Sequence, residues 1–448
     1  MNAFSGNDPS KQEFMKRNTT LGRLSAVLLV ASILSLALSP RAWAQTKFKT
    51  LYEFSGSKDG QYPVAGLIFD QAGNLYGTNG GADTAGTVFK LSPNSDGSWT
   101  ESVLYSFCTL TNCADGASSY AGLIFDAAGN LYGTTAYGGA SGGGIVFKLT
   151  LNPDGRWTES VLYTFCTLTN CVDGGFPAAS LIFDRAGSLY GTTVVGGAHD
   201  FGTVFQLTPT ADGRWKEKVL HHFTDGKDGA SPYATLIFDA AGNLYGTTMF
   251  GGTSSNGNVF KLTPRADGSW KLSVLYSFCS VTNCGDGGEP FAGLIFDQGG
   301  NLYGTTWVGG SRGSCADSGS GCGVVFELTP NSEGRWNERV IHRFTGGAQG
   351  GEPRAGLTFD RAGNLYGTTE LGGALGLCKF AGRAGCGVVF KLAPNSKGAW
   401  TETVLHHFVD HPGARPVAVP IFDAVGNLYG TTLGDGTATH GSVFEITP

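Results

Sequence analysis

The stretch Gly73-Asn74-Leu75-Tyr76-Gly77-Thr78 contains the tetrad Leu-Tyr-Gly-Thr, which decides the fold because it occurs seven times in the chain. The glycine that opens the stretch returns at nearly even spacing, at Gly129, Gly187, Gly242, Gly300, Gly363 and Gly426. The intervals between these glycines are 56, 58, 55, 58, 63 and 63 residues. A period of this length indicates an array of supersecondary units, each of which buries its apolar face only against its neighbours.

Each repeat predicts four short β-strands. In the first repeat the apolar or β-branched runs are 67–70, 74–78, 87–91 and 99–107, and turns rich in Gly, Asp, Asn and Pro separate them. No window outside the N-terminus places apolar residues at helical spacing, and glycine supplies 71 of the 448 residues. The composition and the short runs therefore predict an all-β protein.

The two ends of the chain favour a closed ring. The chain opens with a run of the fourth type at 50–54 and closes with a run of the third type at 443–446, so the last repeat lacks its own outer strand. Pairing of these two runs would leave no unpaired terminal blade. We therefore predict a seven-bladed β-propeller with four-stranded blades, in which strand 50–54 completes the last blade. Eight blades and an open solenoid are the alternatives. Pro420, in the last repeat's first strand, fits because an innermost strand has one unpaired edge.

Residues 1–44 are predicted to be a signal peptide. Lys16-Arg17 precede the apolar stretch 24–39, and Ala42-Trp43-Ala44 gives a small-x-small cleavage pattern before Gln45. An apolar stretch of this length is short for a membrane span. The pattern therefore indicates export rather than a transmembrane anchor.

The chain after this cleavage site, 45–448, is predicted to be one propeller domain, with Met15 as an alternative start of translation. Loss of 1–44 removes five basic and two acidic residues and moves the formal net charge from −6 to about −9. An acidic surface without basic clusters argues against nucleic acid and anionic membranes as partners. We expect a monomer that is secreted, at the cell surface or in the periplasm, and whose partner is a glycan, a peptide or an envelope protein.

Ten cysteines form five local pairs in the sequence. The first three pairs share the spacing Cys-x-x-x-x-Cys, and repeats that lack one member of a pair lack both. This co-occurrence predicts disulfide bonds, whereas a zinc site would need knuckles that converge on one ion. The predicted disulfides are Cys108/Cys113, Cys166/Cys171, Cys279/Cys284, Cys315/Cys322 and Cys378/Cys386.

The loops between second and third strands, and the linkers between repeats, are predicted to lie on one face. Every cysteine and most of the length variation fall in these segments. Variable loops on a rigid scaffold are the usual place for binding sites, so we expect function on this face and in its central funnel. The seven aspartates equivalent to Asp70 open identical turns, for which an Asx-turn role accounts.

The candidate ligand-binding residues are those that break the repeat on this face. Several occupy or adjoin the position after the second-strand Thr-Thr, and others lie in the linkers beside a proline. They supply aromatic surface together with carboxylates, a combination that suits a sugar or peptide ligand. The candidates are Tyr137, Phe250, Trp307, Glu370, Glu289, Glu352 and Arg354.

An alternative function is an extracellular glycoside hydrolase or lyase in which Glu289, Glu352 and Glu370 supply the acid and the base. The strong internal symmetry favours a non-enzymatic binding protein, but the fifth and sixth repeats diverge enough to keep the enzyme possible. A structural envelope protein without a pocket is the third possibility. The sequence has no nucleophile elbow, phosphate-cradling loop or zinc triad, so no cofactor or metal is expected.

The recurring string resembles a known repeat. It reads Asp-Gly-x-x-Pro-x-Ala-Gly-Leu-Ile-Phe-Asp-x-Ala-Gly-Asn-Leu-Tyr-Gly-Thr-Thr and is followed by Gly-Thr-Val-Phe-Lys-Leu. This string is similar to the Gloeo/Verruco (GloVer) tandem repeat of exported bacterial proteins, most clearly over 228–262 and 286–328, and the resemblance extends over 50–448. It implies a bacterial secreted or cell-surface protein, and many relatives carry a C-terminal sorting anchor. It supplies no catalytic residues.

Overall fold

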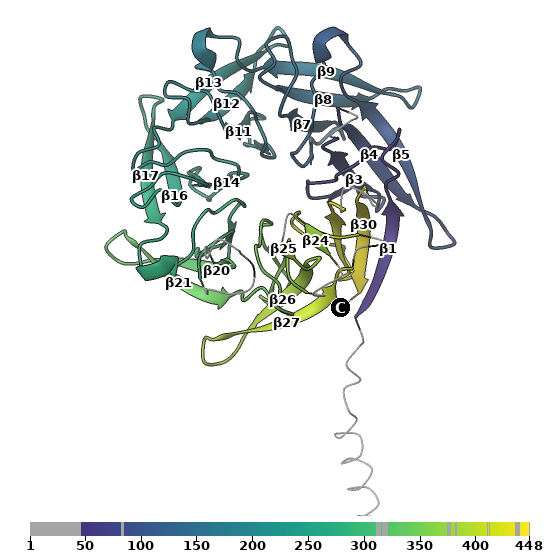
Figure 1. Cartoon of the computed structure of the whole chain (residues 1–448). Coiled ribbons are helices and arrows are strands. Elements are labelled where there is room, and N and C mark those ends of the chain that lie inside the picture. The colour runs from purple at the N-terminus through teal and green to yellow at the C-terminus, as the bar shows by residue number, and fades with distance from the viewer. Residues whose placement is uncertain are drawn as a thin grey trace, which may run out of the picture. The chain divides into compact units, whose positions relative to one another are not determined.

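In a computed structural model, the chain forms a ring of seven four-stranded antiparallel blades (Figure 1). The structure describes residues 46–447 apart from 82–84, 311–314, 316–320, 374–377, 381–382, 410, 412 and 435–439. The predicted seven-bladed β-propeller is thereby confirmed. The predicted signal peptide and the alternative start at Met15 lie outside the described residues. Within the described residues, no helix is long and apolar enough to cross a membrane.

Each blade runs in chain order from an innermost to an outermost strand. The innermost strands are β2 (Ile68–Phe69), β6 (Ile124–Phe125), β10 (Ile182–Phe183), β14 (Ile237–Phe238), β18 (Ile295–Phe296), β22 (Thr358–Phe359) and β28 (Ile421–Phe422). The second strands are β3 (Leu75–Asn79), β7 (Leu131–Thr135), β11 (Leu189–Thr193), β15 (Leu244–Thr248), β19 (Leu302–Thr306), β23 (Leu365–Thr369) and β29 (Leu428–Thr432).

The third strands are β4 (Thr87–Pro93), β8 (Ile145–Leu151), β12 (Thr203–Pro209), β16 (Asn258–Pro264), β20 (Val324–Pro330), β26 (Val388–Pro394) and β30 (Ser442–Thr447). The outermost strands are β5 (Trp99–Ser106), β9 (Trp157–Thr164), β13 (Trp215–His222), β17 (Trp270–Ser277), β21 (Trp336–Arg343), β27 (Trp400–His407) and β1 (Lys47–Glu53). Outside the blades lie the hairpin β24 (Lys379–Phe380) and β25 (Arg383–Ala384), and the 3-10 turns η1 (Thr111–Cys113), η2 (Thr169–Cys171) and η3 (Thr282–Cys284).

The second strand of each blade is buried throughout, and its side chains pack between neighbouring blades. In β3, Leu75 is fully buried, and Gly77 leaves room for Phe89 of β4, because a Cβ at this glycine would lie 2.5 Å from the Phe89 ring. The same close approach of a phenylalanine ring recurs at the tetrad glycine of all seven repeats. Any side chain at this position would displace that ring from the core, which explains why the tetrad repeats with glycine.

The first threonine after that glycine joins adjacent blades. The Thr78 hydroxyl donates to the carbonyl oxygen of Ala121 in the next blade at 2.8 Å. Equivalent hydrogen bonds of 2.8–3.4 Å form at all seven interfaces. The expected Asx-turn is also present, since Asp70 accepts from the backbone N–H groups of Ala72 and Asn74.

The N-terminal strand closes the ring as predicted. β1 pairs antiparallel with β30, with Phe48 opposite Ile446, so that the purple and yellow ends of the chain lie side by side in Figure 1. The strand begins earlier than the predicted 50–54, at Lys47. Pro420 directly precedes β28 rather than lying within it. The innermost strands of the other blades begin at the same position of the repeat, so the proline takes no ladder hydrogen bond from the sheet.

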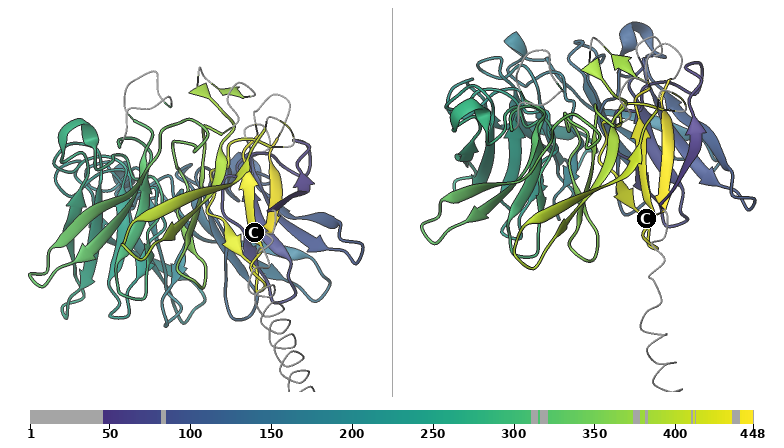
Figure 2. Two further views of the ribbon diagram at one scale, coloured as in Figure 1. Left: turned by 90° about the horizontal axis from the view of Figure 1, so that it is seen from below. Right: turned by 60° about the horizontal axis from the view of Figure 1, so that its bottom comes forward.

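The five predicted disulfides are all present. They lie in the segments that the side views place on one side of the ring, opposite the tight turns (Figure 2). We call this side the loop face and the opposite side the turn face. Cys322 and Cys386 are fully buried and belong to the apolar clusters between blades, so these two disulfides tie the longest loops to the core.

Candidate binding site in the central funnel

One non-glycine residue in each repeat adopts a left-handed backbone conformation at the entrance to the funnel. Its φ lies between 52° and 61° at Tyr62, Ser118, Phe176, Ser231, Glu289, Glu352 and Arg415. Hydrogen bonds explain this uncommon conformation. The N–H of Glu352 donates to Cys322 of the previous blade at 2.8 Å, and its carbonyl oxygen accepts from the N–H of Glu370 at 3.2 Å. All seven residues make this pair of bonds, so the backbone here bridges two blades.

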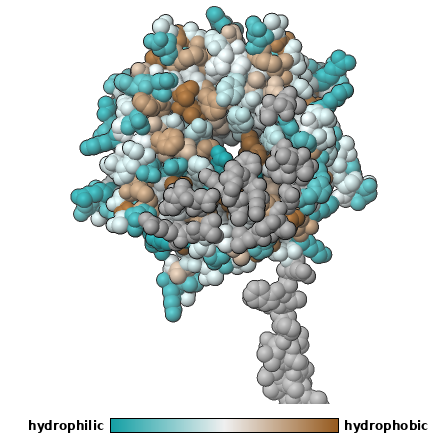
Figure 3. Space-filling model, in the orientation of Figure 1, coloured by the Kyte–Doolittle hydropathy of each residue, from teal (hydrophilic) through white to brown (hydrophobic). Residues whose placement is uncertain are grey.

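Two residues further along, each repeat contributes one side chain to the funnel wall. A cavity of about 340 Å³ is lined by all seven of these side chains, with Phe176 and Leu433 completing the wall. In ring order they are Val64, Tyr120, Ala178, Tyr233, Phe291, Arg354 and Val417. We call this set the funnel ring. Figure 3, which looks onto the loop face, shows apolar side chains gathered around the central opening.

Three of the seven side chains in the funnel ring form a stack of flat groups. The Tyr233 and Phe291 rings stack with centroids 4.7 Å apart, and the Arg354 guanidinium lies 4.5 Å from the Phe291 centroid and 5.4 Å from that of Trp307. Such a stack is held by ring contacts and by the attraction of a cation to aromatic faces. On the other side of Tyr233 the next ring position is the small Ala178, so the stack of flat side chains ends at Tyr233.

A network of paired charges supports Arg354. Glu370 is buried and accepts from Arg415 Nε at 3.0 Å, from Arg415 Nη2 at 2.5 Å and from Arg354 Nη1 at 3.4 Å. Glu352 is also buried, and its Oε2 accepts from the Trp307 indole N–H at 2.9 Å. Two arginines therefore share the Glu370 carboxylate, whereas Glu352 accepts from the Trp307 indole.

The structure brings four of the predicted site residues together, namely Trp307, Glu352, Arg354 and Glu370. Glu289 adjoins them through its backbone, because its carbonyl oxygen accepts from the Trp307 N–H at 3.1 Å. The Glu289 side chain is half-buried, and burial raises the pKa of its carboxyl group. These five residues form one connected part of the funnel.

Tyr137 and Phe250 occupy a different register. The residues equivalent to Trp307 are Ala136 and Met249, so Tyr137 and Phe250 lie one position further along and are 50% and 40% exposed. Successive residues of an extended chain point to opposite sides. Tyr137 nevertheless contacts Phe176 of the cavity wall, with ring centroids 5.1 Å apart. No ring contact among the described residues joins Phe250 to the cavity.

Sequence reasoning missed most of the funnel ring and identified only Arg354 in it. The sequence does mark these positions, because the funnel-ring residue is the variable residue between proline and alanine in the repeated string Pro-x-Ala. Arg415 was also missed. It lies 45 residues from Glu370, in the next blade, and only the closed ring places it beside that carboxylate.

The histidine pairs lie in the outermost strands, away from the funnel. His221 Nε2 lies 3.0 Å from Asp228 Oδ2, and burial lowers the pKa of His221 despite this carboxylate. His406 stacks on Phe48 with ring centroids 3.7 Å apart. Within the described residues, no group of three or more His, Cys, Asp or Glu side chains could hold a metal ion.

A family model described as the Gloeobacter/Verrucomicrobia repeat matches four overlapping stretches of the chain, at 40–171, 105–316, 156–380 and 286–448. No curated protein matches the chain. Among solved structures, a candidate 6-phosphogluconolactonase from Bacteroides uniformis is similar at a TM-score of 0.50 and 16% identity, covering 82% of this chain and 88% of that one.

Two further solved structures are similar at lower TM-scores. A candidate 6-phosphogluconolactonase from Bacteroides fragilis has a TM-score of 0.48 and 17% identity, covering 82% of this chain and 87% of that one. A candidate oxidoreductase (glucose dehydrogenase) from Thermus thermophilus has a TM-score of 0.42 and 14% identity, covering 90% of this chain and 100% of that one. At these identities the likeness shows the fold alone.

Proposed function

Because the chain belongs to the Gloeobacter/Verrucomicrobia repeat family and its repeats enclose an aromatic cavity, we propose that it is an exported protein that binds a neutral glycan in the central funnel. The observation that carries the proposal is the funnel ring. One position of the repeat is aromatic in Tyr120, Tyr233 and Phe291 but small in Ala178, so aromatic side chains line the cavity on both sides of Ala178. A cavity of about 340 Å³ lies at the lower end of the range that ligand pockets have.

The chemistry of these walls suits a sugar ring. The C–H groups on one face of a pyranose carry partial positive charge and pack against the negative face of an aromatic ring. The Tyr233 ring ends the stack beside Ala178 and lines the cavity. The Nε–H of Arg354 is buried and has no acceptor among the described residues, so a ligand hydroxyl would supply the acceptor that this donor lacks.

The balance of charge favours a neutral ligand over an ionic one. Both Arg354 and Arg415 already donate to the Glu370 carboxylate. An anionic ligand would have to compete with Glu370 for its arginines, and a cationic one would meet the Arg354 guanidinium on the aromatic stack. A peptide or an envelope protein that inserts an uncharged side chain is the alternative occupant.

Export is part of the same proposal. Residues 1–44 would be removed as a signal peptide, leaving 45–448 as the mature chain. Five disulfides in one domain are typical of an oxidising compartment, which supports secretion, a cell-surface location or the periplasm.

Glycoside cleavage is the second candidate function, and one observation favours it. Burial raises the pKa of Glu289, as a general acid at neutral pH requires. The other two acids are less suited to proton transfer, since Glu370 is bound by two arginines and Glu352 by the Trp307 indole. Binding without turnover is therefore the function that we put first.

The test is a glycan-array and cell-wall-fraction binding screen with the mature protein, in which reducing-sugar release is assayed on every hit. We expect binding without turnover, and we expect Ala178→Phe to abolish it by filling the gap. The ring already holds phenylalanine at Phe291, so the backbone tolerates this residue and the variant should fold. Tyr233→Ala should weaken binding at least about tenfold, because stacking on an aromatic ring contributes roughly 1 kcal/mol or more.

Phe201→Ala is the matched control, since Phe201 is a partly exposed aromatic residue on the loop face that does not line the cavity. It should leave binding unchanged. Retained glycan binding in Ala178→Phe would place the ligand elsewhere and refute the funnel site. Sugar release that disappears in Glu289→Gln would replace the binding proposal with a hydrolase.

A further inference from the structure

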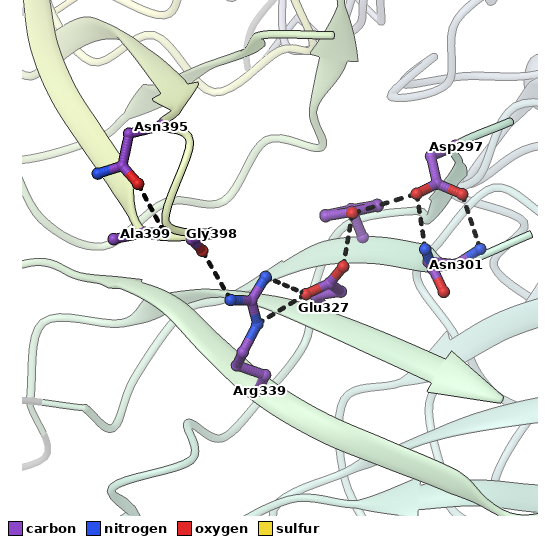
Figure 4. Close-up of polar contacts among 8 residues, drawn as sticks. Asp297, Asn301, Glu327, Arg339, Asn395, Gly398 and Ala399 are labelled. Atoms are coloured by element: carbon purple, nitrogen blue, oxygen red, sulfur yellow. Dashed lines mark hydrogen bonds and ion pairs between the residues drawn. The ribbon is translucent and has the colours of Figure 1, made fainter. Parts of the chain in front are cut away.

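The tyrosine of the repeated tetrad is not available to a ligand, as Tyr303 of the fifth blade illustrates. Tyr303 is buried, and its hydroxyl donates to Glu327 Oε1 at 2.7 Å and also lies 3.2 Å from Asp297 Oδ2. Glu327 is held in turn by Arg339, whose Nε donates to Oε2 at 2.8 Å (Figure 4). The tetrad tyrosines of the other six blades are buried as well. A ligand that stacks on tyrosine must therefore use one outside the tetrad.

Tyr137, which follows β7 on the loop face, is such a tyrosine. It is 50% exposed, and its hydroxyl has no hydrogen-bond partner among the described residues. The fold does not by itself expose this position. Leu371 of the sixth blade forms the equivalent isolated bridge, with Gly351 in place of Ala117, and is only 2% exposed. The exposure of Tyr137 is therefore a property of the second blade.

A chain of aromatic contacts joins Tyr137 to the cavity of the funnel. The Tyr137 ring meets that of Phe176 edge-on, with centroids 5.1 Å apart, and the Phe176 ring lies 6.2 Å from that of Tyr120. Phe176 and Tyr120 both line the cavity. Tyr120 packs on Gly80 of the first blade, where a Cβ would lie 2.7 Å from the Tyr120 ring. Three neighbouring rings thus connect the exposed mouth of the funnel with the cavity wall.

Tyr137 also lies within electrostatic range of Tyr233, on the other side of the third blade. Burial raises the pKa of the Tyr233 hydroxyl, Arg354 lowers it, and Tyr137 raises it. Such effects arise only between groups that are close to one another. Tyr233 lines the cavity beside Ala178, so Tyr137 stands at the mouth near the same part of the cavity.

The pairing of Tyr137 with Phe176 is not a general property of the repeat. Phe250 has the position of Tyr137 two blades further on and is also exposed. In the blade that follows Phe250, however, the residue that corresponds to Phe176 is Glu289. The blades on either side of Phe176 have serine at its position, namely Ser118 and Ser231. An aromatic pair at the mouth of the funnel is therefore a departure from the repeat, as is the cavity wall below it.

We propose that Tyr137 forms an outer subsite of the funnel, so that the ligand is an oligosaccharide whose end unit enters the cavity while the next unit stacks on Tyr137. This inference rests on the proposed glycan binding and adds the length of the ligand to it. The C–H face of a sugar unit packs on an aromatic ring, and the unpartnered Tyr137 hydroxyl can exchange a hydrogen bond with a sugar hydroxyl.

The test is isothermal titration calorimetry of the mature protein with neutral sugars of increasing length, from the monosaccharide to the tetrasaccharide. The cellulose, starch and N-acetylglucosamine series serve as probes, together with any series that the glycan array identifies. We expect the disaccharide or trisaccharide to bind at least about fivefold tighter than its monosaccharide. Tyr137→Ala should remove this gain and leave the affinity for the monosaccharide unchanged. Tyr137→Phe should keep the gain, because the ring remains.

Phe250→Ala is the matched control, because it removes an exposed aromatic residue at the same position of another blade, and it should keep the gain. Equal affinities for the monosaccharide and the tetrasaccharide would overturn the outer subsite while leaving glycan binding in place. A gain that survives in Tyr137→Ala would do the same. If no sugar binds, in these series or on the array, the glycan proposal itself fails and the outer subsite with it.

Discussion

The Thr431 hydroxyl donates a hydrogen bond of 3.3 Å to the carbonyl oxygen of Ala65, which joins the last blade to the first across 366 residues. The same bond occurs at the six other interfaces, so closure repeats a contact that the array already uses. β1 adds a second closing contact by pairing with β30. The last interface therefore uses the contacts of the other six and adds one strand pair that joins the two ends of the domain.

The closing bond predicts a measurable loss of stability in Thr431→Val. The substitution leaves the buried carbonyl oxygen of Ala65 without its donor, which should lower the free energy of unfolding by about 1–3 kcal/mol in urea denaturation. Thr192→Val, which removes the equivalent bond to Ala234 at 3.4 Å, should cost a similar amount. Thr100 is exposed, and Thr100→Val should change stability by less than about 0.5 kcal/mol. Equal stabilities of all three variants would contradict this account.

The tetrad glycine predicts a steric effect. In Gly77→Ala the new methyl group would lie 2.5 Å from the Phe89 ring, so the free energy of unfolding should fall by about 1–3 kcal/mol. Phe89→Leu should restore part of this loss when combined with Gly77→Ala, because it removes the atoms that clash. Gly347→Ala adds a methyl group that meets nothing within 4 Å and serves as the control. Thermal or urea unfolding of the single and double variants would measure the coupling.

A row of half-buried glutamates predicts that stability falls as the pH rises toward neutrality. Burial, with a smaller effect of the Asp173 carboxylate, raises the pKa of Glu217 to about 7, and Glu159 beside Asp115 behaves in the same way. The native state therefore binds protons that the unfolded state has already released near its ordinary pKa of about 4.5. The stabilisation is complete below about pH 4.5 and is lost as the pH rises through about 7.

Urea unfolding between about pH 4.5 and 8 would measure this effect. We expect a decrease of about 1 kcal/mol for each such carboxyl group, after allowance for partial solvent access. Glu217→Gln should flatten the slope by one group's contribution, since the amide stays neutral at every pH. Asp96→Asn, at an exposed aspartate whose side chain bonds only Ser98, should leave the slope over this range unchanged. A stability that rises over this range would refute the assignment.

The sequence predicted the parts of the molecule that depend on repetition. The number of blades follows from the seven copies of the Leu-Tyr-Gly-Thr tetrad, and the disulfides follow from cysteines that recur in pairs. The closing strand follows from the additional strand near Thr50, which supplies the strand that the last repeat lacks. Trp307, Glu352 and Glu370 were also identified, because they depart from the repeated string. Such departures are visible without coordinates.

The funnel required coordinates for physical reasons. Tyr137 and Phe250 differ from Trp307 by one position, and a shift of one residue in an extended chain reverses the side to which a side chain points. The left-handed backbone at Phe176 depends on hydrogen bonds to two blades, one of them outside its own repeat. Sequence spacing carries neither kind of information.

The hydrogen bonds of Glu370 to Arg354 and Arg415 predict that Glu370 stabilises the folded protein, whether or not the funnel binds or cleaves a ligand. Glu370→Gln removes the negative charge that faces Arg354 and Arg415, and the Arg415 side chain is only 11% exposed. Removal of one partner from a buried ion pair is costly, so the free energy of unfolding should fall by about 3 kcal/mol. The double variant Glu370→Gln/Arg415→Met should recover much of this loss, because it also removes the cation that Glu370 neutralises.

The surface pair Asp212 and Arg214 supplies the matched control, since both side chains are about half exposed or more. Asp212→Asn should change the free energy of unfolding by no more than about 1 kcal/mol, as solvent screens such pairs. A cost in Glu370→Gln as small as that of Asp212→Asn would show that the network contributes little. Any loss of ligand binding or sugar release in Glu370→Gln would then reflect direct contact with the ligand rather than collapse of the funnel wall.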